Sequence, residues 1–252
     1  MDDIPRAQTP RPADTSYANR MTTEWIPVPG GPFWMGGGPR DNENPRHEVR
    51  VRPFRLARTQ VTREDYQRFL DATGREAPPF WGEAAFAHPR MPAVGPSWED
   101  VMAFCAWMSE RLGLAVRLPT EAEWESAAKA GREVLYPWGD DPPESLPDYS
   151  KRWLDGPEPV DAYPSRHPLG FLGLGENVHE WCSDWYAATW YAVSPADDPL
   201  GPETGTRRSS RGGSWRHQIK VSRCAARSAI PPHMRYADYG FRLAADADGG
   251  AP

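Results

Sequence analysis

The segment from Ser209 to Pro232, SSRGGSWRHQIKVSRCAARSAIPP, brings together residue types that could catalyse a reaction or bind a ligand. It contains a Gly-Gly turn, a tryptophan, a histidine and a cysteine, and it has no acidic residue. The bases between Thr206 and Arg227 are Arg207, Arg208, Arg211, Arg216, Lys220, Arg223 and Arg227. Two interpretations stay open. Either these arginines pair with acidic side chains and stack on tryptophan rings, or Arg216 binds an anionic group such as a substrate carboxylate through two hydrogen bonds.

Other candidate nucleophiles and metal ligands are sparse. The three cysteines, Cys105, Cys182 and Cys224, are odd in number and lack CxxC spacing, which favours a reducing cytoplasm over a disulfide scaffold. Cys105 falls in the apolar stripe of an expected helix and is predicted to be a core thiol. That stripe consists of Val101, Phe104, Cys105, Met108 and Leu112. No pair of the six histidines has His-x3-His spacing, and P-loop, GxGxxG, HExxH and GxSxG motifs are missing from the sequence.

Three helices are expected to help position these residues, all in the first half of the chain. They begin at the N-caps Thr62, Ser97 and Thr120, and the last of these forms a capping box with Glu123. The predicted stops of the first and third helices are Gly74 and Gly131. Before them, residues 25–38 predict a hairpin that enters a loop, and residues 47–57 predict a half-exposed strand.

After Gly131 the hydrophobic periodicity almost vanishes. Strand-sized pieces between turns remain at residues 176–186, 207–216, 221–229 and 239–246. The 252 residues include 29 Pro and 12 Trp, which predicts many short elements joined by ordered loops, with large rings filling the space between them. We therefore expect one α+β domain over residues 24–246, with a disordered leader at 1–23 and a tail at 247–252.

Charge and hydropathy exclude two classes of partner. A net charge of −6 argues against binding of nucleic acid through its phosphates. The sequence has no run of 18 apolar residues, so we expect no membrane span, and its N-terminus has no apolar signal-peptide region. A cytoplasmic location is therefore expected.

The order of several motifs resembles that of the formylglycine-generating enzyme (sulfatase-modifying factor) superfamily. The motifs are PGGPFWMGG, RLPTEAEWE, YPWG, NVHEW, RGGSW and YGFRLA, and the resemblance covers roughly residues 24–246. It implies a C-type-lectin-like α+β fold with unusually little regular secondary structure. The superfamily includes copper enzymes that oxidise a sulfatase cysteine to formylglycine, non-heme iron enzymes, pyoverdine-maturation proteins, and lectin-like proteins that bind ligands without catalysis.

The resemblance also implies a departure from the copper branch. Two cysteines that follow the RGGS turn hold Cu(I) in that branch, and thiolates suit this ion. Here His217 stands at the first of these positions, the second falls near Ile219 or Lys220, and Cys224 matches a cysteine that is not a ligand. Copper-dependent formylglycine formation is therefore not expected.

A different transition-metal site is one expectation from the same alignment of motifs. His179 replaces an aromatic residue of the family motif, and the resemblance implies that it faces His217 in one pocket. With a carboxylate beside them, two imidazoles would suit Fe2+ or a similar ion. His233 and Asp238 are the candidates for a third ligand. The alternative is that His179 stacks in the core and His217 is a hydrogen-bonded loop residue.

A calcium site is expected at residues 173–180. The resemblance matches Glu180 to a carboxylate ligand, and Glu176 and Val178 to carbonyl ligands, of a Ca2+ loop. The family's Asx ligand is missing, because Gly173 stands at its position. Glu180 and His179 should point to opposite sides of a strand.

These observations predict a metal- and O2-dependent oxidoreductase that acts on an amino-acid-like or peptide substrate. Catalytic candidates are His217, His179 and Ser214, the last by its match to a family active-site serine. Trp215, Arg216 and Trp181 are expected to bind a small-molecule or peptide substrate, which would be anionic if Arg216 grips it. The alternative function is a non-catalytic ligand-binding or accessory module.

Overall fold

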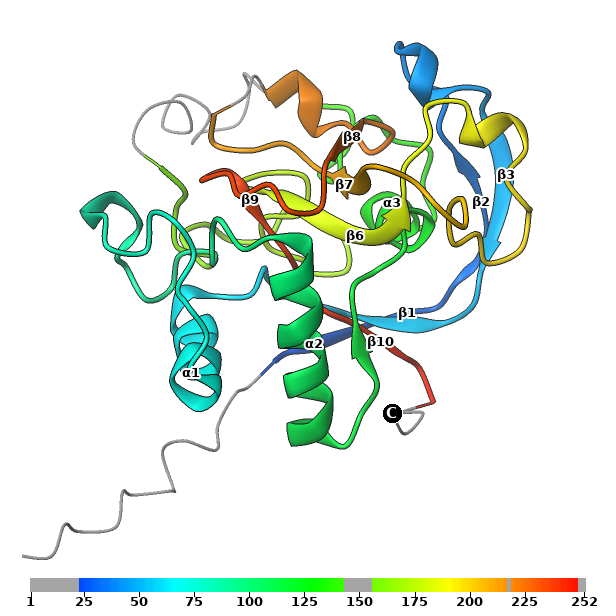
Figure 1. Cartoon of the computed structure of the whole chain (residues 1–252). Coiled ribbons are helices and arrows are strands. Elements are labelled where there is room, and N and C mark those ends of the chain that lie inside the picture. Colours follow the sequence, from blue (N-terminus) through cyan, green and yellow to red (C-terminus); the bar gives the residue numbers. More distant parts are fainter. Residues whose placement is uncertain (1–22, 143–155, 217–218, 249–252) are drawn as a thin grey trace, which may run out of the picture.

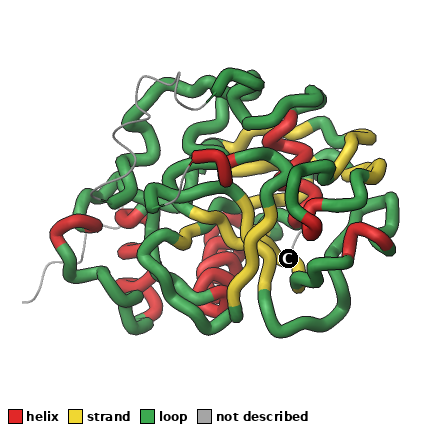
Figure 2. The backbone as a smooth tube through the Cα atoms, turned by 90° about the horizontal axis from the view of Figure 1, so that it is seen from above, coloured by secondary structure: helices red, strands yellow, loops and turns green. Residues whose placement is uncertain are grey.

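The computed structural model describes residues 23–142, 156–216 and 219–248. Most of the predicted leader and tail, and also His217, lie outside these residues. Within them the fold is a mixed α+β arrangement in which loops outweigh regular secondary structure, as Figure 2 shows. The predicted fold class is confirmed.

The described strands form two four-stranded sheets and one two-stranded ribbon (Figure 1). The first sheet has the order β1–β4–β10–β5, and both neighbours of β10 are antiparallel to it. A strand from the late part of the sequence therefore lies inside a sheet whose other strands come from the first half. The strands are β1 (Trp25–Val28), β4 (Phe54–Ala57), β5 (Val116–Arg117) and β10 (Ala244–Asp246).

The second sheet, of order β8–β7–β6–β9, carries most of the residues singled out above. Its pairs are antiparallel except β6 with β9, which is parallel. These strands are β6 (His179–Trp185), β7 (Arg208–Arg211), β8 (Arg227–Ile230) and β9 (Tyr239–Gly240). The ribbon pairs β2 (Gly31–Met35) with β3 (His47–Val51). The strand-sized segments predicted from the sequence are thus present, but two predictions near the start need correction. The predicted hairpin does not form, because β1 pairs with β4 and β2 pairs with β3, and the single strand predicted at residues 47–57 is divided into β3 and β4, which lie in different sheets.

Three α-helices lie where the caps predict them. They are α1 (Arg63–Thr73), α2 (Trp98–Leu112) and α3 (Glu121–Lys129). Thr62, Ser97 and Thr120 each accept a hydrogen bond from the backbone N–H three residues on, which confirms the three N-caps. Short 3-10 helices occupy Asp41–Glu43, Ala84–Phe86, Trp190–Ala192 and Ile219–Ser222.

Two details of the helix prediction need correction. The third helix ends at Lys129, one residue earlier than a stop at Gly131 predicts: Ala130 is its C-cap, with a φ of 49°, and Gly131 follows with a φ of 72°. Leu112 is 40% exposed although it belongs to the predicted apolar stripe, since it lies in the last turn of α2, beyond the packed face. The other four members of the stripe are buried.

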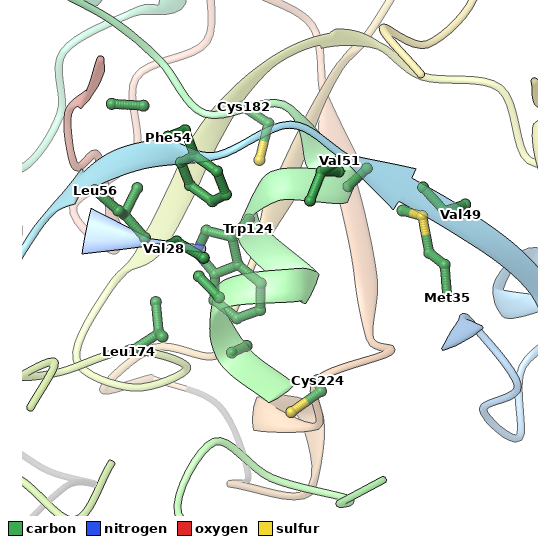
Figure 3. Close-up of a cluster of buried hydrophobic side chains, with 14 of the residues drawn as sticks. Val28, Met35, Val49, Val51, Phe54, Leu56, Trp124, Leu174, Cys182 and Cys224 are labelled. Atoms are coloured by element: carbon green, nitrogen blue, oxygen red, sulfur yellow. The ribbon is translucent and has the colours of Figure 1, made fainter. Parts of the chain in front are cut away.

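The core beside α3 is built around Trp124, which is fully buried (Figure 3). Val28 of β1 and Phe54 and Leu56 of β4 pack in the same cluster, so α3 lies between the first sheet and the segment that carries Cys224. None of the described helices combines the length and the apolar character that crossing a bilayer requires.

Candidate functional site

Two arginines of the basic segment form a buried salt-bridge network with α3. Arg227 donates to both carboxylate oxygens of Glu121, at 2.7 and 2.9 Å. Arg211 is fully buried and contacts Glu125 and Glu121. Although burial opposes ionisation of Glu121, Arg227 and Arg211 hold the pKa of its carboxyl below the ordinary value. Arg211 and Arg227 therefore have a structural role in the core.

Two further arginines of the segment have similar structural partners. Arg223 forms a paired contact with Glu43, at 2.7 and 2.8 Å. The guanidinium of Arg208 lies between the rings of Trp98 and Trp185, 3.6 and 3.5 Å from their centroids. The interpretation that the arginines pair with acids and stack on tryptophans is thus confirmed for Arg208, Arg211, Arg223 and Arg227.

All three cysteines are buried, with exposed fractions of 0–1%. Burial raises the pKa of the Cys105 and Cys224 thiols to about 12 and also raises that of Cys182. Cys182 and Cys224 lie on either side of the Trp124 ring in Figure 3. The prediction that Cys105 is a core thiol is confirmed, and the other two cysteines are also core residues.

The turn after β7 joins several candidate residues. Ser214 donates from Oγ to the Oδ2 atom of Asp238 at 3.2 Å, and Arg216 approaches the other oxygen of that carboxylate at 3.7 Å. His179 shares a hydrogen bond of 2.7 Å between its Nδ1 and the carbonyl of Gly212, in the same turn. The backbone N–H of His179 also donates to the carbonyl of Asp238. The second sheet therefore brings His179, Ser214 and Asp238 together from three segments.

His179 is buried, and its ring centroid lies 5.0 Å from that of Tyr239 with the two planes tilted by 41°, so it packs in the core but does not stack. His217 falls outside the described residues, and the predicted meeting of the two imidazoles stays a prediction. His233 is exposed. Among the described residues, His, Cys, Asp and Glu side chains form no group of three that could hold a metal ion.

A pocket that is open to solvent lies next to this turn. Ser214 and Trp215 line one part of it, and residues between Gly156 and Asn177 line most of the rest. The Trp215 indole is held by hydrogen bonds from its backbone N–H to Asn177 and from its Nε1 to Ala237, at 2.9 and 3.2 Å. Of the predicted site residues, Ser214, Trp215 and Glu176 line this pocket.

The prediction for Trp181 needs correction, because its side chain is fully buried and does not line the pocket. Its Nε1 donates to the carbonyl of Pro96 at 3.2 Å, and its ring packs in the core with Tyr239. Arg216 also lies outside the pocket lining; it stays half-exposed beside Asp238. Arg216 is therefore not in a position to bind an anionic substrate inside this pocket.

Two pocket residues were not singled out from the sequence. Asn177, with a φ of 72°, brackets Glu158: its Oδ1 accepts from the Glu158 N–H and its Nδ2 donates to the Glu158 carbonyl. Tyr163 donates to the Glu158 carboxylate at 2.6 Å. An Asn inside NVHEW is a residue that tolerates the left-handed region, which could have suggested a turn, but no local pattern marks Glu158.

The carboxylate of Glu180, matched above to a calcium ligand, is saturated with donors. Its two oxygens accept from Arg242, Gln60 and Trp124, at distances of 2.7–2.8 Å. A divalent cation bound to this carboxylate would face the guanidinium of Arg242. Val178 is fully buried beside Phe86, and its N–H donates to the Glu176 carbonyl. The residues as placed do not fit Ca2+ at Glu180.

A family model described as sulfatase-modifying factor enzyme 1-like domain matches residues 11–247. The formylglycine-generating enzyme of Streptomyces coelicolor is 36% identical to this chain, over 91% of each protein. A Bos taurus protein named inactive C-alpha-formylglycine-generating enzyme 2 is 29% identical, over 91% of this chain and 90% of that protein.

Similarity extends to solved structures. The structure of PvdO from Pseudomonas aeruginosa superposes with a TM-score of 0.74 at 26% identity, over 88% of this chain and 94% of that chain. The chain therefore belongs to the sulfatase-modifying factor (formylglycine-generating enzyme) family.

Proposed function

We propose that this protein is an oxidoreductase that acts on an amino-acid-like or peptide substrate bound in the Ser214–Trp215 pocket. The observation that carries the proposal is the position of this pocket, directly beside the turn to which His179 and Asp238 are tied. Similarity over almost the whole chain to a formylglycine-generating enzyme supports oxidative chemistry. Trp215 offers a partly buried aromatic wall, and Ser214 and Asn177 offer polar groups that could orient a peptide-like ligand.

A transition metal such as Fe2+ is part of this proposal, and His179 has the surroundings of a ligand. If its Nδ1 carries the proton and donates to the Gly212 carbonyl, as metal-binding imidazoles do to second-shell carbonyls, Nε2 is the atom that would coordinate the ion. The remaining ligands would include His217, which lies outside the described residues. When bound, the ion would supply activation of O2 for the oxidation. The three buried thiols are not candidates for a ligand pair.

The test combines metal content and oxygen consumption. The purified chain is analysed for iron and copper, reconstituted anaerobically with Fe(II), and followed with an oxygen electrode in the presence of short Cys- and His-containing peptides. We expect about one metal ion per chain, the number that a facial set of ligands would hold. We also expect O2 uptake in the wild type and none in His179→Gln, whose circular dichroism spectrum should show that it remains folded. Protein that binds neither iron nor copper and consumes no O2 would contradict the proposal.

The second candidate function is ligand binding without catalysis. The observation that favours it is the burial of all three thiols, together with a well-formed pocket that needs no metal for its lining. In the experiment above this alternative predicts no metal and no O2 uptake. It fails if His217→Ala abolishes a turnover reaction in protein that remains folded.

A further inference from the structure

Several oxygens of residues 173–180 point at one nitrogen atom, the Nε2 of Gln60. This nitrogen donates to the Gly173 carbonyl at 2.8 Å and to Oε1 of Glu180 at 2.8 Å, and it lies 3.5 Å from the Glu176 carbonyl. Gln60 is 1% exposed and precedes the N-cap of α1. Carbonyl oxygens that converge with a carboxylate are also the donor set that Ca2+ prefers. Here an amide nitrogen is at their centre.

The charge of Glu180 is balanced without a metal ion. Arg242 donates to its Oε2 from Nε and to its Oε1 from NH2, both at 2.7 Å, and both side chains are almost wholly buried. The three remaining N–H groups of Arg242 also have acceptors, so the guanidinium uses all five donors. Those acceptors are the carbonyls of Ala57, Arg58 and Leu172, at 3.0–3.1 Å.

The space that the Gln60 amide fills is open because residue 173 is glycine. A Cβ on Gly173 would lie 2.8 Å from Oε1 and 2.9 Å from Nε2 of Gln60, closer than real Cβ atoms approach, and the φ there is +63°. Oε1 of Gln60 is buried and accepts no hydrogen bond within the described residues, so the amide is held by its nitrogen. An Asp or Asn at position 173 could not share this space with Gln60.

We infer that the Gln60 amide and the Arg242 guanidinium together take the position and the charge of a divalent cation, so that residues 173–180 are braced without calcium. Gly173, which has no Cβ, leaves the space that the Gln60 amide occupies. The proposal concerns the loop beside the pocket and does not rest on the proposed oxidoreductase function.

The first test uses the full wild-type chain, passed over a chelating resin and unfolded thermally in EGTA and in millimolar CaCl2. We expect the same unfolding midpoint in both, because an ion that does not bind the folded state cannot stabilise it. A drop of several degrees in EGTA would overturn the inference.

The second test is a cycle of Gln60→Ala, Gly173→Asp and the double variant. The control is Gly170→Asp, since Gly170 also has a positive φ, of +86°, but a Cβ there meets nothing within 4 Å. With Gln60 present, Gly173→Asp should lower the unfolding midpoint more than Gly170→Asp does. The double variant removes the amide and adds a carboxylate, which together with Glu180 outweighs the positive charge of Arg242, so calcium should raise its midpoint more than that of the wild type.

Two results would contradict the inference. One is that Gly173→Asp and Gly170→Asp lower the unfolding midpoint equally. The other is that calcium raises the midpoint of the double variant no more than that of the wild type. If the double variant does not fold, the comparison of Gly173→Asp with Gly170→Asp and the wild-type measurement still decide the matter.

Discussion

Arg242 shows how this protein keeps charged groups inside its core. Its five N–H groups reach Glu180 and the carbonyls of Ala57, Arg58 and Leu172, so one side chain joins β4, the loop before residue 173 and β6. Such a buried pair adds little stability by itself, because burial of both charges is costly. Removal of one partner is different, since it leaves groups without hydrogen bonds in the core.

We expect Arg242→Lys to destabilise the protein by about 3–5 kcal/mol, because a lysine has three donors and cannot form the planar fork to Glu180. The free energy of unfolding in urea is the measurement. Arg52→Lys is the control, because that arginine pairs with Asp198 while its side chain is 84% exposed. Similar costs for the two substitutions would show that the buried fork is not important.

Asp184 is a buried carboxyl on β6 whose pKa is raised to about 7 by burial and by the negative charge of Glu121. It accepts hydrogen bonds from the Glu121 N–H at 2.8 Å and from Ser183 Oγ at 3.2 Å. Between the ordinary pKa of 3.8 and about 7 the folded state binds this proton more tightly than the unfolded state does. The stability that this proton contributes is therefore lost as the pH rises through that window.

For Asp184→Asn we expect a flatter dependence of the free energy of unfolding on pH between about 4 and 7. We also expect the variant to be more stable than the wild type at neutral pH. The asparagine keeps an acceptor for the Glu121 N–H and cannot become charged. Urea unfolding across this pH range checks the expectation, with Asp197→Asn at an exposed surface pair as control. A curve parallel to that of the wild type would mean that Asp184 is ionised throughout.

At the scale of elements, the helices were predictable because their signals are local. The N-cap oxygen of Ser97 and the Asp100 carboxylate form a reciprocal box within four residues of chain, so the sequence contains both partners. The strands of the second half were predictable only as strand-sized pieces. Their pairing joins residues that are distant along the chain; in the parallel contact of β6 with β9, for example, His179 pairs with Tyr239, about 60 positions away.

The N-cap of α2 offers a prediction at this scale. We expect Ser97→Ala to lower the free energy of unfolding by about 1 kcal/mol, since the Asp100 N–H would lose its acceptor at a buried helix start. Urea denaturation measures the change, and Ser194→Ala, outside any helix, is the control. Equal effects of the two substitutions would mean that the stability of α2 comes from its apolar face alone.

The difference between local signals and long-range contacts also explains which site residues could be predicted from the sequence. Ser214 and Trp215 belong to a compact motif and do line the pocket, whereas Trp181 was misplaced because alternation along a strand does not reveal which face meets the core. Gln60 was missed because its partners, from Gly173 to Glu180, lie 113 to 120 positions away along the chain. Only the folded chain brings these groups together.

At the scale of the whole molecule, the fold is held by loops that use proline, glycine and tryptophan, as the composition predicts. The pocket is an example: its wall runs through residues 156–177 and meets the Ser214–Trp215 turn, and few of its residues belong to a strand or helix. Rings and backbone hydrogen bonds, rather than sheet ladders, set its shape. This pocket is therefore hard to place from secondary structure alone.

The central position of β10 in the first sheet has a consequence for synthesis of the protein on the ribosome. Residues 244–246 pair with β4 on one side and β5 on the other, so β5 cannot join β1 and β4 before these residues have left the exit tunnel (Figure 1). Until then the growing chain exposes the apolar edge and face that β10 will cover. Nascent chains of this protein must therefore avoid aggregation until residues 244–246 have been made, because the sheet closes only after that point.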